Sequence, residues 1–210
     1  MKGIATRYAS AFPGTVKVCF EPDIKDIELV FGENKQNFDI VSDLSHQSSD
    51  TKGTALTKGV FRDDSSSIFK GMIKIDEGAK NSESYLAEHS LLLGKGARAN
   101  AVPGLEIKTN DVKATHSASV AQIDAEQLFY LNTRCLSYAE AERTIIEGFL
   151  EPLSRKMSFQ VRAWIAYLIE SKWENKELSI NTDEELAKFV EIEETRYNEN
   201  AEIEQHYKYR

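Results

Sequence analysis

Short stretches in which apolar and polar residues alternate make up most of the first half of the chain. One such stretch has apolar residues and a single histidine on one parity: Val112, Ala114, His116, Ala118 and Val120. A period of two is typical of a strand with one buried face. The pattern therefore places His116 on the apolar face of a strand.

Turn-forming residues separate these stretches from one another. The pattern predicts strands at 38–41, 60–62, 71–75, 84–93, 104–109 and 111–122, with turns at 63–67, 76–83 and 94–104. No segment of helical length lies between the later strands, which fits either an antiparallel sandwich or a solenoid of stacked β coils. The repeat is irregular, so the spacing alone does not choose between these two folds.

Helical patterns begin immediately after the last predicted strand. Asp124 with Gln127, and Ser137 with Glu140, have the spacing of helix capping boxes. Pro152 is expected to interrupt the second helix. Further helices are expected over about 159–168 and 182–197, followed by an acidic tail that is either a solvated helix or partly frayed.

Composition supports the same division of the chain. Ten of the eleven glycines precede residue 122, and the net charge is -1 over residues 1–122 but -7 over residues 123–210. We therefore expect a β core at 1–122 and a helical domain with an acidic C-terminal tail at 123–210.

Charge and hydropathy narrow the classes of partner and compartment. The net charge of -8 argues against a nucleic-acid partner. No apolar run approaches the roughly 20 residues that cross a bilayer, and the first residues lack a secretory apolar region, so the cytoplasm is expected with no membrane partner. The two cysteines, Cys19 and Cys135, form neither a disulfide framework nor a metal cluster.

Several longer runs carry a resemblance to a known family. They are SHQSSDTKGTALTKGVFRDDSSSIFKGMIKI, SESYLAEHSLLLGKGARANAVPGLEI, NDVKATHSASVAQIDAEQLFYLNTR and LSYAEAERTIIEGFLEPL. In this order, from about Ser45 to Leu153, they resemble the core of the SufB/SufD family, the scaffold proteins of the SUF iron–sulfur cluster assembly system.

The resemblance implies a fold and a set of partners. The expected fold is mainly β, a right-handed parallel β-helix followed by a small α-helical domain. Members of the family pair through their β-helices, so the partner is either a SufB/SufD-type chain or a second copy. Their helical regions dock the ATPase SufC, here about 138–172, where Trp164, Tyr167 and Trp173 would be the anchors. The cargo is a nascent Fe–S cluster or iron.

The sequence also departs from the family pattern. Family chains usually have more β-helix before the matched core, so this chain is expected to be a compact member or a fragment. Ala97 and Ala114 stand where the SufB and SufD branches, respectively, often carry cysteine. Cys135 follows Arg134 at a position where the family usually has glycine.

His116 and Cys135 are the candidate ligands for iron or a nascent cluster. The resemblance places a histidine at position 116 near the interface of two scaffold subunits, and neutral imidazole is a suitable ligand for iron. The alternative for His116 is a hydrogen-bonded interior histidine. A glycine at 135 would suit a positive φ after a helix, so a cysteine there is expected to be strained and structural, with ligation as the alternative.

The remaining histidines and Cys19 are expected to have no such role. His89 is expected in the core, while His46 and His206 are expected on the surface. Cys19 is expected to point away from the apolar face of its strand, and no motif supports a role for it as a sulfur acceptor.

Sequence motifs of common enzymes are absent. The chain has no phosphate-binding GxxxxGK[ST] loop, no GxSxG and no HExxH. The chain is therefore not expected to hydrolyse ATP itself, and the family resemblance implies a non-enzymatic scaffold. Two alternatives remain: a carbohydrate-active β-helix enzyme such as a polysaccharide lyase, and an interaction module that has lost cluster chemistry.

Overall fold

The computed structural model describes residues 7–8, 15–20 and 24–154. Its elements are β1 (Arg7–Tyr8), β2 (Thr15–Phe20), β3 (Ile24–Gly32), β4 (Asn37–His46), β5 (Lys52–Phe61), β6 (Ser66–Ile75), β7 (Ser82–Leu92), β8 (Arg98–Ile107), β9 (Val112–Gln122), α1 (Ala125–Thr133) and α2 (Tyr138–Ser154). The chain forms two compact units, residues 1–142 and 143–210. No helix in the described part of the chain is long and apolar enough to span a bilayer.

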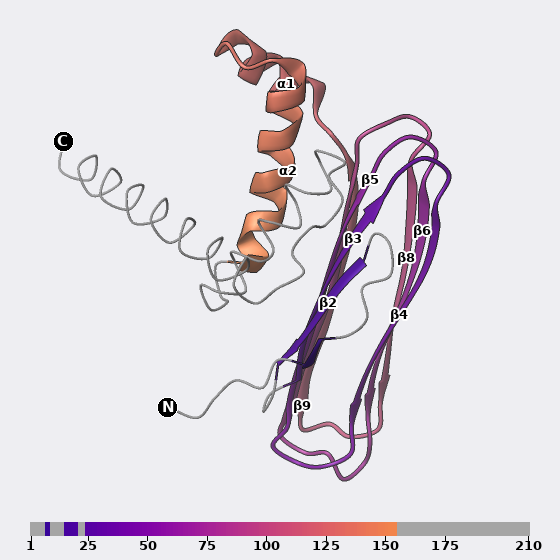
Figure 1. Cartoon of the computed structure of the whole chain (residues 1–210). Helices are drawn as coiled ribbons and strands as arrows, with labels where there is room; N and C mark the ends of the chain where they lie inside the picture. Colours follow the sequence, from indigo (N-terminus) through magenta and orange to yellow (C-terminus); the bar gives the residue numbers. More distant parts are fainter. Residues whose placement is uncertain (1–6, 9–14, 21–23, 155–210) are drawn as a thin grey trace, which may run out of the picture. The chain divides into compact units, whose positions relative to one another are not determined.

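Strands β3 to β9 form a parallel β-helix, as expected from the family resemblance. They alternate between two sheets, with strand orders β1-β2-β3-β5-β7-β9 and β4-β6-β8 (Figure 1). Ile27 pairs with Leu56, Leu56 with Ala87 and Ala87 with Ser117, so equivalent positions recur every 29 to 31 residues. Because these pairings are parallel, the antiparallel sandwich is excluded. Among the described strands, antiparallel pairing is confined to β1 with β2 and β2 with β3.

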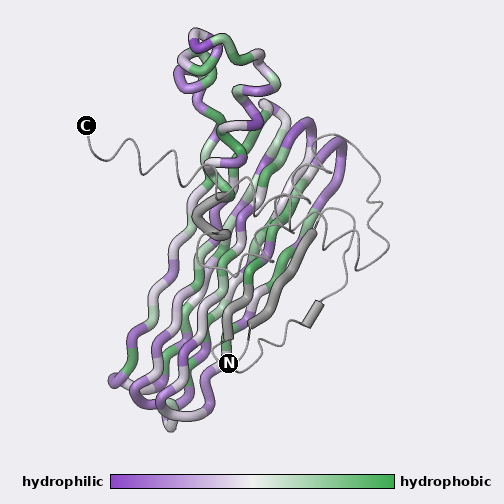
Figure 2. Tube along the Cα trace, turned by 60° about the vertical axis from the view of Figure 1, so that its left-hand side comes forward, coloured by the Kyte–Doolittle hydropathy of each residue, from purple (hydrophilic) through white to green (hydrophobic). Residues whose placement is uncertain are grey.

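The two sheets face each other and enclose a narrow apolar core. Alternate residues of each strand point inward, and Figure 2 shows alternating green and purple segments along the strands. The rings of Phe38 on β4 and Phe61 on β5 meet across the interior with centroids 6.1 Å apart. A Cβ added at Gly71 on β6 would lie 2.4 Å from Leu86 Cδ2 on β7, so glycine is what allows that close approach. These inward contacts fix which face of each strand is buried.

Asparagine and aspartate make the tight turns between the strands. Asn34, Asp50, Asp63 and Asn81 all adopt positive φ values of 55° to 60°, a conformation that these short polar side chains tolerate better than most. The turns also stack on one another. The Asn34 backbone N–H donates to Asp63 Oδ2 at 2.9 Å, and Asn81 Nδ2 donates to Asp50 Oδ1 at 2.6 Å.

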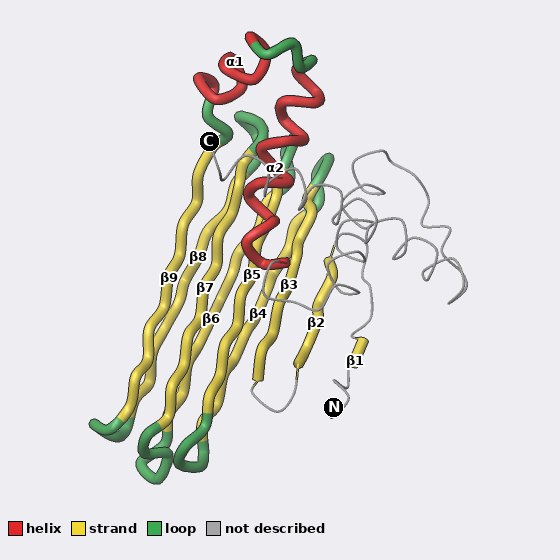
Figure 3. The backbone as a smooth tube through the Cα atoms, turned by 90° about the vertical axis from the view of Figure 1, so that its left-hand side faces the viewer, coloured by secondary structure: helices red, strands yellow, loops and turns green. Residues whose placement is uncertain are grey.

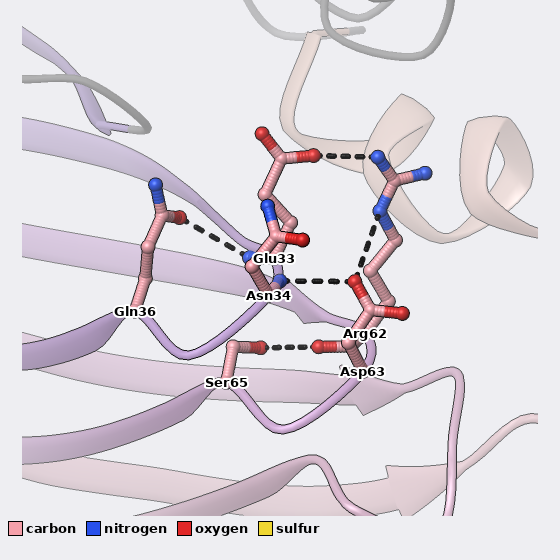
Figure 4. A network of polar contacts seen from close by, with 6 residues as sticks. All are labelled: Glu33, Asn34, Gln36, Arg62, Asp63 and Ser65. Atoms are coloured by element: carbon pink, nitrogen blue, oxygen red, sulfur yellow. Dashed lines mark hydrogen bonds and ion pairs between the residues drawn. The ribbon is translucent and has the colours of Figure 1, made fainter.

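One of these turn stacks includes an ion pair between successive coils. Arg62 contacts the Glu33 carboxylate one coil away, and the Gln36 side chain accepts from the Glu33 backbone N–H (Figure 4). Ser65 is fully buried at the base of the same turn and donates its hydroxyl to the Arg62 carbonyl at 2.7 Å. The polar runs that predict turns in the sequence therefore also join one coil to the next.

The six strands expected from the sequence are all present as β4 to β9, and most begin earlier than the alternation predicts. β5 begins eight residues before the expected 60. A second correction concerns 94–104, which was expected to be a turn. Residues 98–104 instead belong to β8 and pair in parallel with β6. Small residues such as Ala99 and Ala101 pack inward there, and their weak apolar character hides the alternation.

The two helix starts are confirmed. Asp124 is the N-cap of α1, and its side chain accepts from the Glu126 backbone N–H at 2.8 Å. Ser137 and Glu140 form the expected capping box at the start of α2, with Glu140 Oε2 accepting from the Ser137 backbone N–H at 2.8 Å. Pro152 does not interrupt α2, which continues to Ser154. The expected helices at 159–168 and 182–197, with the acidic tail, lie outside the described residues.

Candidate functional site at the open end of the β-helix

The last coil of the β-helix has no coil stacked upon it in the described part of the chain. Strands β8 and β9 are the last strands of their sheets (Figure 3). Ile73 and Ile75 on β6 are only 0% and 1% exposed, whereas their β8 partners, Leu105 and Ile107, are 40% and 42% exposed. The same inward-facing positions thus change from core to surface within one coil.

His116 lies at the middle of this open end. It pairs with the buried Leu86, so its side chain shares the inward face of the sheet, as the alternation predicts. The ring is nevertheless exposed, and it has no hydrogen-bond partner among the described residues. The ring is exposed because no further coil covers β9 in the described part of the chain. Ala114 and Ala118 are the neighbouring inward-facing residues of β9.

Two buried polar side chains lie on β7, the strand that pairs with β9. Ser84 and Glu88 are on the inward face of β7, on either side of Leu86, and are 5% and 3% exposed. Glu88 Oε1 accepts from the Ser90 hydroxyl. Glu88 Oε2 and Ser84 Oγ have no partner among the described residues. Burial raises the pKa of the Glu88 carboxyl above its ordinary value.

Cys135 occupies a separate place on the chain. It follows α1 with a φ of 67°, and its backbone N–H donates to the Asn132 carbonyl at 3.1 Å. This is the left-handed conformation that favours glycine at a helix C-terminus, as expected from the sequence. The thiol is exposed. Six residues of β9, roughly 20 Å of strand, and all of α1 separate it in sequence from His116.

The described residues do not bring the predicted ligands together. No group of three or more histidine, cysteine, aspartate or glutamate side chains in this part of the chain could hold a metal ion. Ala97 and Ala114 stand where the family resemblance led us to expect cysteine; Ala97 is buried and Ala114 packs partly against the core. Cys19 lies on β2, where no side chain is described. Any metal-binding role of His116 would therefore need ligands beyond the predicted thiols.

His46 was expected on the surface, and this prediction is wrong. It is the last inward-facing residue of β4, only 3% exposed, and its Nδ1 lies 2.8 Å from Thr51 Oγ1. The same Thr51 hydroxyl also forms a hydrogen bond with Ser82 Oγ on β7, at 2.9 Å. Burial lowers the pKa of His46. The alternation of β4 extends through His46, but the polar run that follows conceals it.

His89 lies on the outer face of the sheet. Its side chain is half-buried rather than in the core, and its Nδ1 lies 2.6 Å from Ser119 Oγ on β9. Burial first, and then the charge of Lys58, lower the pKa of His89. His206 lies outside the described residues.

Comparison with known proteins supplies the family. The family model described as the SUF system FeS cluster assembly SufBD core domain matches residues 23–149, which include all of the open end. The chain belongs to the SufBD core family. The match is centred on the β-helix described above and extends into α2.

Curated relatives are consistent with this assignment. The SufBD core here is 36% identical over 151 residues to the iron–sulfur cluster assembly protein SufD of Bacillus subtilis, covering 71% of this chain and 34% of that protein. It is 28% identical to SufBD family proteins of Mycobacterium leprae, over 70% of this chain and 17% of that protein, and of Synechocystis, over 67% and 29%. The chain therefore spans between 17% and 34% of the length of these relatives.

Replacing Cys135 by glycine is expected to stabilise the protein by about 1 kcal/mol, because glycine adopts positive φ without steric cost. Chemical denaturation measures the change. Cys135→Ala keeps the Cβ atom and serves as the control, which should leave the free energy of unfolding near that of the wild type. An equal gain in both variants would contradict an origin in backbone conformation.

His46 makes the stability of the protein depend on pH. Its pKa is lower in the folded state than in the unfolded state, so the unfolded chain binds the extra proton more readily. The stabilising effect is complete above the unfolded pKa of about 6.5 and is lost as pH falls below it. His46→Gln should therefore flatten the fall in melting temperature between pH 7 and pH 5.5. His89 remains in both proteins and cancels in the comparison. Parallel curves for the two proteins would contradict this role of His46.

Proposed function

We propose that the chain is a non-enzymatic scaffold subunit of SUF iron–sulfur cluster assembly, with the nascent cluster or its iron as cargo. Membership of the SufBD core family supports this role. The observation that carries the proposal is the open end of the β-helix. There the exposed His116 lies in the middle of β9, the last strand of its sheet. A scaffold needs such an accessible ligand, because its cargo must both arrive and leave.

The open end is also the proposed pairing surface, for a second copy or a SufB/SufD-type partner. An outermost strand presents backbone N–H and C=O groups that another strand can bind. The inward-facing side chains of the same strands add an exposed apolar surface, made by Leu105, Ile107 and Val120. Pairing would cover this apolar surface and bring His116 close to the contact between the two chains.

The helical region is the proposed docking site for a SufC-type ATPase. The region expected to dock, about 138–172, begins with α2, and its described part ends at Ser154. The aromatic anchors Trp164, Tyr167 and Trp173 lie outside the described residues. The chain itself has no phosphate-binding loop, so the partner would supply ATP hydrolysis. The cytoplasm is the proposed compartment.

His116 is the proposed cargo ligand, and Cys135 is a second candidate that acts elsewhere on the chain. The exposed imidazole can offer a nitrogen to iron without unfolding its strand. The exposed Cys135 thiol could bind sulfur or iron, but at a different place on the chain from His116. A module without cluster chemistry remains the second candidate function, and the alanines at positions 97 and 114 favour it because the expected thiols are missing.

Substituting Ile107 tests the pairing surface. Ile107→Glu places a carboxylate on the exposed inward face of β8 and should raise the dimer dissociation constant at least tenfold, as measured by light scattering over a dilution series. Ile68→Glu is the matched control, since Ile68 is 44% exposed on the outer face of the central strand β6. A wild-type chain that stays monomeric at all concentrations, or equal effects of the two variants, would contradict homodimer pairing through this end.

Substituting His116 tests the cargo role. His116→Gln should lose the cluster after anaerobic reconstitution with iron and sulfide, whereas His116→Cys, which supplies another ligand, should retain part of it. Both variants should melt within a few degrees of the wild type, because an exposed side chain contributes little to stability. Iron content and visible absorption measure the cluster. Normal iron in both variants together with a much lower melting temperature would make His116 a structural residue.

A further inference from the structure

The two strands at the open end differ in the backbone groups that face outward from the stack. In a parallel sheet, alternate residues direct both of their backbone groups to the strand on one side, and the residues between them to the other side. At the start of β8, the Arg98 backbone N–H donates to the Ser65 carbonyl at 3.0 Å. Just after β8, the Lys108 backbone N–H donates to the Ile75 carbonyl at the same distance. The even-numbered residues of β8 therefore bond to β6, and the odd-numbered residues face the open edge.

Pro103 lies in the middle of the residues that face the open edge of β8. There are five of them: Ala99, Ala101, Pro103, Leu105 and Ile107. Proline has no backbone N–H, and its ring stands where the hydrogen would be. The bonds between β8 and β6 lose nothing, because residue 103 is not one of those that bond to β6. The open edge, however, lacks its central donor, so a further strand would meet a gap halfway along β8.

The open edge of β9 has no such gap. At its end, the Ile123 backbone N–H donates to the Leu92 carbonyl at 2.8 Å. At its start, the Asp111 carbonyl accepts from the Asn81 backbone N–H at 2.6 Å. The odd-numbered residues of β9 therefore bond to β7, and the six even-numbered residues of 112–122 face the open edge. None of the six is proline, so another strand could bond along the whole of β9.

Apart from Pro103, the side chains of β8 suit a second copy of the same strand. If two β8 strands met antiparallel about residue 103, Leu105 would face Ala101 of the second copy and Ile107 would face Ala99. Leu105 and Ile107 are exposed, whereas Ala99 and Ala101 are small and pack partly against the core. Large apolar side chains would thus meet small ones. An exposed apolar edge of this kind promotes strand addition unless something prevents it.

We propose that Pro103 prevents a second copy of the chain from pairing with the open edge of β8, and so restricts backbone pairing at the open end to β9. The inference rests on the proposed pairing role and deepens it, because it names the strand that pairs and the residue that selects it. β8 then contributes to the contact only through its side chains. Proline on an edge strand is one of the ways in which proteins avoid unwanted strand addition.

Replacing Pro103 by alanine tests the inference, because Pro103→Ala restores the missing N–H without adding a large side chain. Sedimentation velocity of the full chain over a dilution series measures self-association. The concentration at which half of the chains are associated should fall at least about fivefold, since restored backbone bonds add to the contact. The double variant Pro103→Ala with Ala101→Pro is the matched control, because it moves the proline two residues along the same edge. Its midpoint should lie within about twofold of the wild type.

Amide hydrogen exchange of the wild type gives a readout that does not depend on any variant being folded. On association, the amides of Ala114 and Ala118 on β9 should become protected. The amides of Ala101 and Leu105 on β8 should exchange as fast as in the monomer. In Pro103→Ala, association should protect the two β8 amides as well. Melting temperatures close to that of the wild type establish that the variants compared by sedimentation are folded.

The outcomes separate this inference from the proposed pairing. Protection of Ala101 and Leu105 in the associated wild type would overturn the inference, and so would an unchanged association midpoint in folded Pro103→Ala. If association protects neither strand, the chains meet through side chains alone; the inference fails and the pairing surface stands. If the wild type stays monomeric, homodimer pairing fails. The block at β8 then stands if Pro103→Ala associates, and falls if it does not.

Discussion

Parallel strand pairing gives each residue of this β-helix the same environment as its equivalent one coil away, until the stack ends. Ile73 is completely buried because β8 covers it, and Leu105 on β8 is exposed because nothing in the described chain covers that strand. The open end therefore needs no special loop or insertion. It exposes inward-facing side chains that the rest of the solenoid hides, together with one unpaired row of backbone groups on each sheet.

Much of this fold could be predicted from the sequence, and the errors have physical causes. Alternation located six strands, and capping residues located both described helix starts. The spacing did not distinguish a solenoid from a sandwich, since strand pairing partners are about 30 residues apart and leave no local pattern. The predicted β8 began too late because the alanine, asparagine and proline residues at its start have weak strand propensity.

The site was only partly predictable for a related reason. Alternation gives the face of a strand, so it placed His116 correctly on the inward face; it does not show whether another strand covers that face. β7 is harder still, because Ala87 and Leu91 are buried on its outer face while Leu86 and Glu88 are buried on its inner face. With both faces buried, neither parity marks the interior, and Glu88 resembles an ordinary charged residue of a half-exposed strand.

The positions of His116 and Cys135 bear differently on function. The strained conformation of Cys135 has a cost that glycine would avoid, yet strain alone does not identify a functional residue. The Cys135 backbone N–H makes one hydrogen bond, and its exposed thiol belongs to no group of three or more possible metal ligands among the described residues. His116 instead lies on a strand that pairs with β7 along its whole length. A metal ligand must be held in place, and this fixed strand favours His116 over Cys135, which lies beyond the end of a helix.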